Sequence, residues 1–476
     1  MRDSVRRLFL NSLALLVAAS PAIAASPHEK PNILLILSDD HSAPQLGCYG
    51  DPNARTPHFD RFAAEGMRFD RAYTTSPQCM PSRASMLTGR SPVDIGMSRF
   101  SAALPPDIVT APDLLKTAGY VVGVGGRDFH LDGWSKKGPP HLAEIDRRHG
   151  RTKFSSRMDF VKQDHFNEQI PSERILAEFL DQRGDRPFFF WLNFYEPHRP
   201  WRPAKRPDPA SIILPPDLPD YPSVREDLAN FYGYLTEMDT KFGAVMALLE
   251  ERGLKDNTLV VFVGDNGASW FRGKGTLYER GCHVPLLVRW PGRVAPESST
   301  SSLVSGEDIT PTLLAAAEVS ADPAMTGRSF LPLLRNQPYE GRDAVFTERG
   351  AHGVSLPRDT IAFDLTRAIT TDRYRLIYNA LWQLPYRSVD IESYDQEIWR
   401  DLKRRHDAGT LPEPFARLFF APSRPMFELF DLQADPYELN NLAGRPEVAD
   451  LEKNLKERLD EWMILQDDFV PLSLSR

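Results

Sequence analysis

Four short apolar runs in the chain are continuous rather than alternating, and this pattern constrains the fold more than any other feature of the sequence. The runs are residues 32–37, 120–124, 188–194 and 259–263. A strand exposed on one face alternates apolar and polar side chains, whereas a strand buried on both faces is apolar throughout. Helical patterns lie between the runs, at residues 112–118, 172–182 and 226–252. Strands that alternate with helices predict an α/β protein with a mostly parallel, doubly wound sheet.

Each apolar run is followed by polar residues of kinds that carry chemistry. These residues are Asp39 and Asp40, Arg127 and His130, His198, and Asp265 and Asn266. Parallel strands of a doubly wound sheet end at the same edge, and ligands bind beyond that edge. One such ending is ordinary, but four of them predict a single shared site.

The acidic endings predict a metal site. Asp39, Asp40, Asp265 and Asn266 offer only oxygen ligands, which suit a hard divalent cation. Without a cation, three clustered carboxylates would repel one another. Taken singly, an Asp-Asp pair is more often a turn or a helix cap, and an Asp-Asn-Gly run is more often a tight turn. The metal interpretation therefore depends on their joint placement.

Basic side chains are the next candidates. Arg83, Arg127 and Lys274 could bind an anionic group of a substrate, and His130 and His198 could donate or accept protons. Each of them alone is more often a surface cation or a histidine satisfied in the core. Their position after the apolar runs, rather than their type, favours the functional interpretation.

Cys79 is one of only three cysteines, too few for a disulfide framework. No thiol-protease motif surrounds it. Pro81 suits the first turn of a helix, which places residue 79 near a helix N-terminus, where a negative charge is stabilised. The residues around Cys79 leave open what it does there.

The pattern changes after about residue 355. Short antiparallel strands are expected at residues 367–370, 374–378 and 427–432, followed by an amphipathic helix at 447–465. We therefore expect a catalytic domain at residues 25–355 and a smaller C-terminal α+β domain at 356–476.

Residues 1–24 are typical of an export signal, with a basic start, an apolar middle and an Ala-Ile-Ala cleavage site. The run Arg6-Arg7-Leu8-Phe9-Leu10 also resembles a twin-arginine signal, and an ordinary secretory signal is the alternative. We expect a periplasmic or secreted protein. The rest of the chain has no apolar stretch long enough to span a membrane, and a net charge of -8 argues against nucleic-acid binding.

The run Cys79-Met80-Pro81-Ser82-Arg83, followed by Leu87-Thr88-Gly89-Arg90, resembles the motif of the type I sulfatases, members of the alkaline-phosphatase-like superfamily. The opening PNILLILSDD, the TPHFDRFAAEG helix and the EPH, GDNG and GKGTLYERG segments are similar to that family as well. The likeness extends over essentially the whole chain after the leader.

The resemblance implies that a maturase, either a formylglycine-generating enzyme or a radical enzyme, oxidises Cys79 to formylglycine (3-oxoalanine). It also implies that Asp39, Asp40, Asp265, Asn266 and the modified residue 79 bind Ca²⁺. Catalytic roles would fall to Arg83, Arg127, His130, His198 and Lys274, with His198 as the acid for the leaving group. The family often has Gly-Lys-x-His where this chain has Gly126-Arg127-Asp128-Phe129-His130, so Arg replaces Lys and one residue is added.

The C-terminal half is similar to heparan N-sulfatases (sulfamidases), in Arg367 and in residues 374–379 and 384–385. This likeness implies exo-action on a sulfated saccharide of the glycosaminoglycan type or another kind, with His352 and Arg367 as candidate sugar contacts. Three alternatives remain: an arylsulfatase or choline-sulfatase type of enzyme, a phosphonate or phosphate monoester hydrolase of the same fold, and an inactive glycan-binding relative. The motif around Cys79 favours a sulfatase, and the intact carboxylates argue against an inactive relative.

Overall fold

The computed structural model describes residues 30–473, except residues 101, 128–129, 134–139, 152, 164–169, 353–359, 362 and 393–394. The predicted leader, residues 1–24, lies outside the described residues. Among the helices that are described, none combines the length and the apolar character needed to cross a membrane.

The central element is an eight-stranded sheet with the strand order β5-β4-β6-β1-β7-β8-β2-β9. Its strands are β1 (Asn32–Ser38), β2 (Met67–Phe69), β4 (Val121–Gly126), β5 (Phe160–Gln163), β6 (Phe188–Asn193), β7 (Thr258–Gly264), β8 (Leu286–Arg289) and β9 (Ser298–Thr300). The five strands from β5 to β7 in this order are all parallel, whereas β8 runs antiparallel to both of its neighbours. The predicted mostly parallel sheet is confirmed, and all four apolar runs are adjacent strands in it.

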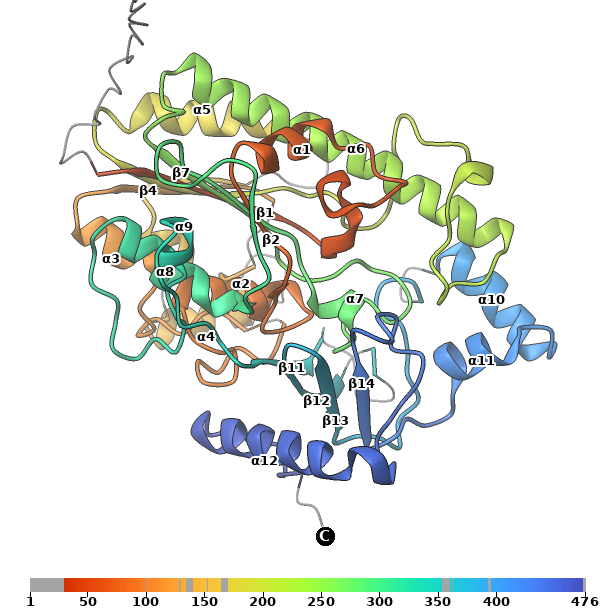
Figure 1. Ribbon diagram of the computed structural model, residues 1–476. Coiled ribbons are helices and arrows are strands. Elements are labelled where there is room, and N and C mark those ends of the chain that lie inside the picture. The colour runs from red at the N-terminus through yellow and green to blue at the C-terminus, as the bar shows by residue number, and fades with distance from the viewer. Residues whose placement is uncertain are drawn as a thin grey trace, which may run out of the picture. The chain divides into compact units, whose positions relative to one another are not determined.

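Helices cover both faces of this sheet (Figure 1). One layer contains α1 (Pro57–Ala64), α5 (Ser172–Gln182) and α6 (Pro222–Glu251), and the other contains α2 (Cys79–Thr88), α3 (Ala111–Thr117), α8 (Ile309–Ala316) and α9 (Leu331–Leu334). On β1, Leu34 and Ile36 join the core beneath α6, and Ile33 and Leu35 join the core beneath α2. Because both faces of β1 are buried, its positions from Ile33 to Leu37 are all apolar.

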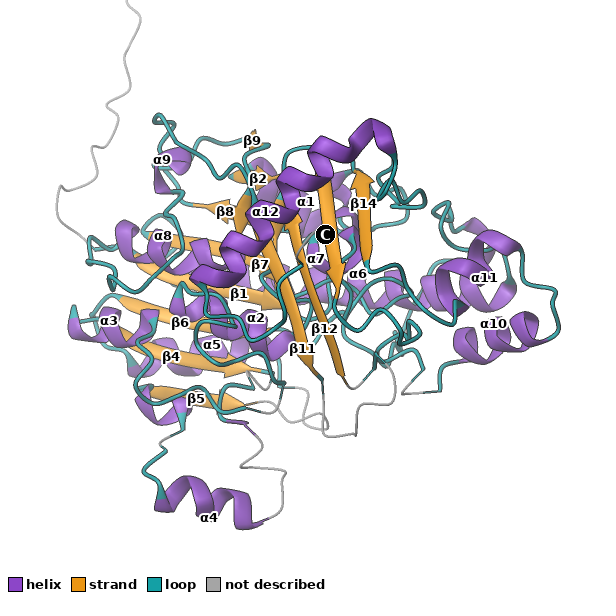
Figure 2. Ribbon diagram, turned by 90° about the horizontal axis from the view of Figure 1, so that it is seen from below, coloured by secondary structure: helices purple, strands orange, loops and turns teal. Residues whose placement is uncertain are grey.

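A second sheet is fully antiparallel and consists of β11 (Val345–Ala351), β12 (Phe363–Thr370), β13 (Tyr374–Asn379) and β14 (Phe427–Asp431), in that order. Helix α12 (Ala449–Leu465) crosses this sheet, as Figure 2 shows, and packs on it through Leu455, Leu459 and Met463. The three strands and the helix predicted for the C-terminal part are present. Strand β11 precedes the proposed boundary at residue 355, and that boundary stays a prediction.

Several elements were not predicted from the sequence. Besides β2, β5, β8, β9, α8 and α9, they include α4 (Pro140–Arg148), α7 (Glu279–Cys282), α10 (Glu397–Asp407), α11 (Glu413–Phe420), β11 and the two-stranded sheet of β3 (Ala72–Tyr73) and β10 (Val304–Ser305). Strand β11 could not be predicted from the apolar pattern, because its buried positions include the charged residues Glu348 and Arg349. It matters for the site, since the Glu348 amide donates to the Thr75 carbonyl at 2.9 Å and so joins the second sheet to the segment that leads into α2.

Candidate active site

The site lies where the four parallel strands β4, β6, β1 and β7 end side by side. Asp39 and Asp40 follow β1, and Asp265 follows β7, the neighbouring strand. The Asp40 amide donates to the Asp265 carboxylate at 3.0 Å, which ties the two strand ends together. The single shared site expected from the strand endings is therefore present in the fold.

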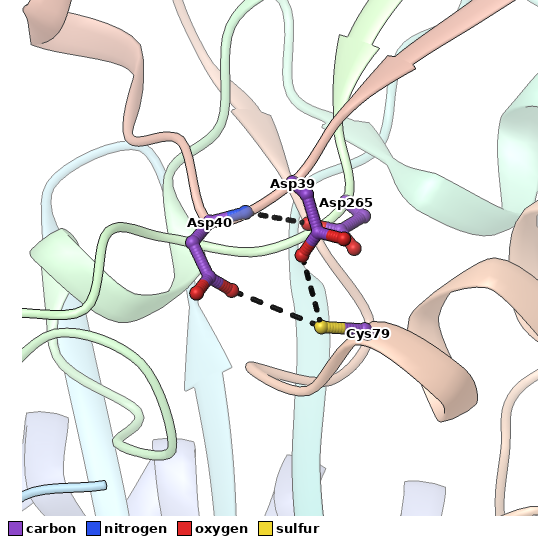
Figure 3. Close-up of side chains that lie close together, drawn as sticks. All are labelled: Asp39, Asp40, Cys79 and Asp265. Carbon is purple, nitrogen blue, oxygen red and sulfur yellow. Dashed lines mark hydrogen bonds between the residues drawn. The ribbon is translucent and has the colours of Figure 1, made fainter. Parts of the chain in front are cut away.

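Cys79 is the first residue of α2 and points at these carboxylates (Figure 3). Its Sγ atom lies 3.2 Å from Oδ1 of Asp39 and 3.8 Å from Oδ1 of Asp40. Burial raises the pKa of the Cys79 thiol well above its usual value, and the negative charges of Asp265 and Asp39 add to that shift. A thiolate is the nucleophilic form of cysteine, so this environment suppresses ordinary thiol chemistry.

Four side chains form a buried group with the composition of a metal site. Asp39, Asp40, Cys79 and Asp265 each offer one ligand atom, and these atoms lie within 4.8 Å of one another. Burial raises the pKa of Asp40 to about 8, the Lys274 ammonium opposes that shift and nearby carboxylates add to it. A divalent cation would remove the repulsion that these carboxylates exert on one another.

Asn266 fits the same group. Its Nδ2 donates to Oδ1 of Asp40 at 2.9 Å, whereas its Oδ1 is buried and accepts no hydrogen bond from any residue that the structure describes. A buried amide oxygen without a donor is costly unless a cation or another group binds it. Carboxylate and amide oxygens are the ligands that Ca²⁺ prefers, so the residues fit such an ion.

Arg83 lies one turn after Cys79 on α2, and its guanidinium holds the carboxylates in place. It donates to Asp39 and Asp265 at 2.9 Å each, and to Oδ1 of Asn193 at 2.8 Å. All of these side chains are buried. Asn193 ends β6, so the rule used for the other strand ends applies to it as well, although it was not among the predicted site residues.

Arg127, at the end of β4, forms an ion pair with Asp39, and its guanidinium lies 4.6 Å from the centre of the Tyr195 ring. The planar group that replaces the more usual lysine therefore stacks on an aromatic face, a contact that guanidinium groups favour. Arg127 belongs to the same buried cluster as Arg83.

His198 and Lys274 both contact Asp40. Nε2 of His198 is 3.6 Å from Oδ2 of Asp40, and Nδ1 of His198 bonds the Arg199 carbonyl. Since a carbonyl only accepts, Nδ1 carries the proton of the neutral ring. Burial lowers the pKa of His198 well below its usual value. The Lys274 ammonium binds Asp40 at 2.9 Å and also binds Asp390 at 2.9 Å.

His130 and His352 both pack near Phe100, with ring centres 5.3 Å and 4.7 Å from the centre of its ring. The Gln78 amide nitrogen lies 2.9 Å from Nδ1 of His352. Burial lowers the pKa of His352 to about 3, helped by the nearby Lys274 charge. In the neutral ring, Nδ1 accepts from the amide, so Nε2 carries the hydrogen and can donate.

The structure does not bring Arg367 into this cluster. Its side chain is completely buried on β12 and donates to both carboxylate oxygens of Asp468 and to the carbonyls of Arg349 and Thr366. These contacts favour a structural role over the predicted sugar contact. The sequence could not reveal this, because its partner Asp468 is 101 residues away.

Asp390 is a member of the cluster for which the sequence carries no signal. It follows no apolar run and lies between β13 and α10, in the stretch Arg387-Ser388-Val389-Asp390-Ile391. Its contact with Lys274 and its closeness to Asp40 and His198 identify it.

Comparisons with known proteins were made on sequence and on structure. The sequence model of a family described as Sulfatase matches residues 31–319, and a second, described as N-sulphoglucosamine sulphohydrolase, C-terminal, matches residues 267–399. Human N-sulphoglucosamine sulphohydrolase is 29% identical over 473 residues, which cover 90% of this chain and 89% of that protein. An ulvan-active sulfatase of Formosa agariphila is 29% identical over 463 residues, which cover 91% of this chain and 75% of that protein.

Among solved structures, one of a protein in complex with its substrate D-glucosamine-2-N,6-O-disulfate has a TM-score of 0.70 with this chain. The two sequences are 21% identical, and the match covers 94% of this chain and 100% of the other. At that identity the likeness shows a common fold.

Proposed function

The chain belongs to the sulfatase family, and on that premise we propose that it removes sulfate from a sulfated saccharide by means of an oxidised Cys79 and a bound Ca²⁺ ion. The sequence resemblance to sulfatases is thereby confirmed at the level of the family. The proposal for the site starts from the environment of Cys79.

The observation that carries the proposal is the position of Cys79 in the carboxylate cluster. A buried thiol 3.2 Å from a carboxylate oxygen is a weak nucleophile, because its thiolate would be repelled. An oxygen atom on the same β-carbon would instead face the group of residues that fits a hard cation. The environment therefore suits the product of Cys79 oxidation better than Cys79 itself.

Formylglycine would supply a hydrated aldehyde, in which one hydroxyl attacks sulfur and the other allows sulfate to be expelled as the aldehyde re-forms. The bond broken would be the one that joins sulfur to the oxygen or nitrogen of the sugar, and that atom would leave with a proton. Loss of a proton from the second hydroxyl would then release sulfate. A serine has no second hydroxyl and would stop after the first half.

A Ca²⁺ ion would be held by Asp39, Asp40, Asp265, Asn266 and the oxidised residue 79, and would supply positive charge for the sulfate. Arg83 fixes the orientation of Asp39 and Asp265, and so holds these two proposed ligands close to residue 79 at the start of α2.

His198 is the proposed acid for the leaving atom. Its Nδ1 proton faces the Arg199 carbonyl, so only the imidazolium form carries a proton on Nε2. The negative charge of a bound sulfate favours that form. Lys274 and Arg127 supply further positive charge, and His130 is the proposed aid to breakdown of the sulfated intermediate.

Two observations support a saccharide with an N-sulfo or O-sulfo group as the substrate. The C-terminal family model and the human relative bear the name of an N-sulphoglucosamine sulphohydrolase, and the Formosa agariphila relative is an ulvan-active sulfatase. His352 lies beside Gln78, the residue that precedes Cys79, and its Nε2 hydrogen could contact the sugar. Because the chain has a net charge of -8, we propose exo-action on a short chain end rather than binding along a polyanion.

The proposal includes export to the periplasm or medium through residues 1–24, and maturation of Cys79 by a separate enzyme. The test uses the protein produced together with a maturase. Mass spectrometry of the Cys79 peptide reports the aldehyde, and turnover is measured on N-sulfoglucosamine, O-sulfated hexoses, an aryl sulfate and a phosphonate monoester. Turnover of the phosphonate alone would contradict the proposal. Cys48→Ala is the matched control for Cys79→Ala, since Cys48 lies outside the cluster.

A further inference from the structure

We infer that Asp390 is a positioning residue that holds the ammonium group of Lys274 in place beside the sulfate-binding pocket. The inference rests on the proposed function, because that function makes Lys274 face the sulfate. Asp390 would act through Lys274 and would not touch the reacting atoms.

The geometry places the Lys274 ammonium between two carboxylates. Nζ of Lys274 is 2.9 Å from Oδ1 of Asp40 and 2.9 Å from Oδ2 of Asp390. The exposed fractions of these side chains are 3% for Lys274, 0% for Asp40 and 7% for Asp390. A charge that is buried this deeply is stable only with a hydrogen-bonded partner of opposite charge.

The two carboxylates differ in what else they contact. Asp40 belongs to the group of four that fits a metal ion, together with Cys79, whereas Asp390 does not belong to that group. An ion bound there would neutralise part of the negative charge of Asp40 and weaken the ion pair between Asp40 and Lys274. Asp390 is then the carboxylate that keeps the ammonium at its position.

Asp40, His198 and Asp390 also present ligand atoms within 4.8 Å of one another, which raises the question of a second metal ion. The Lys274 ammonium already binds both of these carboxylates, so a positive charge occupies the space between them. The positive charge of Lys274 would repel a second cation at this position. The arrangement therefore favours an internal ion pair over a second metal site.

The fold presents Asp390 to Lys274 through close contact between two loops. A Cβ atom on Gly275 would lie 2.6 Å from a methyl carbon of Val389, so only glycine permits the approach. Gly275 has a φ of 79°, in the left-handed region, and Arg349 of β11 donates to its carbonyl. The chain neighbours of Lys274 and Asp390 are therefore in close contact, and this contact brings the two side chains together.

The test measures the binding of inorganic sulfate to the Ca²⁺-loaded, oxidised protein by calorimetry, and KM and kcat on an aryl sulfate. Asp390→Asn should weaken sulfate binding and raise KM by about 10–100-fold, the effect of losing one charge-assisted hydrogen bond, with a smaller change in kcat. Asp395→Asn is the matched control. Asp390 has a positive φ of 66°, and Asp395 has one of 47°; Asp395 also pairs with a cation, Arg400, but at the surface.

A double-mutant cycle separates positioning from a general structural effect. In a Lys274→Met background, adding Asp390→Asn should change the sulfate Kd by less than about twofold, because the partner is already gone. A full effect of Asp390→Asn in that background would overturn the inference, as would tighter sulfate binding by Asp390→Asn alone. If Asp390→Asn does not fold, Asp390→Gly keeps the positive φ and gives the same readout.

Two further measurements distinguish a positioning role of Asp390 from a role as metal ligand, and the inference from the proposed function. The Asp390→Asn protein should bind Ca²⁺ with the same stoichiometry as the parent, and a lost ion would overturn the inference in favour of a metal ligand. If the parent protein binds sulfate but turns over no sulfate ester, the proposed function fails, while the sulfate Kd of Asp390→Asn still decides the role of Asp390.

Discussion

Arg83 donates from Nε to the Asp265 carboxylate at 2.9 Å, across 182 residues of sequence and between α2 and the end of β7. Both side chains are completely buried. The same guanidinium binds Asp39, so one side chain joins α2, the helix that begins at Cys79, to two strand ends. The position of Cys79 relative to the carboxylates depends on this junction.

The first prediction follows from that junction. Arg83→Lys keeps the charge but loses the planar fork, so it cannot bind Asp39, Asp265 and Asn193 at once. We expect kcat/KM to fall at least about 100-fold, and the free energy of unfolding to fall by about 1–3 kcal/mol, as when buried hydrogen bonds to charged groups are left unmade. Arg61→Lys, in the exposed pair with Glu65, should change stability by less than about 1 kcal/mol. Equal effects of the two variants on stability would contradict the role given to Arg83.

The second prediction concerns the metal. Chelation should abolish turnover and lower the Tm, and Ca²⁺ at 100 times its Kd should restore about 2.7 kcal/mol of stability. Asn266→Ala should weaken this stabilisation, because it removes the buried amide oxygen that lacks a donor. Asn53→Ala, which loses two exposed side-chain hydrogen bonds to the Ile213 backbone, is the control and should keep the stabilisation by Ca²⁺. A Tm independent of Ca²⁺ would count against the site.

The third prediction is a pH dependence of stability. Burial raises the pKa of Glu348 to about 7, with Arg367 opposing and Asp468 adding to the shift. A carboxyl group with a raised pKa in the fold is favoured when protonated, so its contribution to stability is present below its unfolded pKa and is lost as the pH rises through about 7. Glu348→Gln removes this loss. Denaturant unfolding from pH 5 to 8 should show the variant gaining on the parent by up to about 3 kcal/mol. A constant difference across that range would be the contrary result, and Glu340→Gln on the surface is the control.

The fourth prediction separates sugar recognition from packing. His352→Ala should raise KM for the saccharide far more than for a small aryl sulfate, because His352 binds Gln78, next to Cys79 in the chain, and lies outside the group of Asp39, Asp40, Cys79 and Asp265. Arg367→Ala should instead lower stability by about 3–5 kcal/mol by leaving Asp468 unpaired, with equal KM changes on both substrates. A saccharide-specific KM effect of Arg367→Ala would restore its predicted role in sugar contact.

The residues at strand ends could be predicted because one physical rule governs them. Asp39, Asp265 and His198 follow strands that are buried on both faces, and parallel strands deliver their ends to one edge. Neither the position of Asp390 nor the internal role of Arg367 follows from such a rule. Both depend on ion pairs between residues that are far apart in the sequence. Strand β11 could not be predicted either, because its buried positions include charged side chains, which interrupt the apolar pattern.

The most direct measurement of the central claim compares the parent protein with Cys79→Ser in single-turnover and steady-state hydrolysis, with mass analysis of residue 79. The parent should contain formylglycine and turn over repeatedly. Cys79→Ala should lose at least about 4 kcal/mol of transition-state stabilisation. Cys79→Ser should take up one sulfo group and stop, because its single hydroxyl leaves no route for expelling sulfate. An unmodified Cys79 thiol in a protein that turns over fully, or a Cys79→Ser variant with parental turnover, would contradict the account.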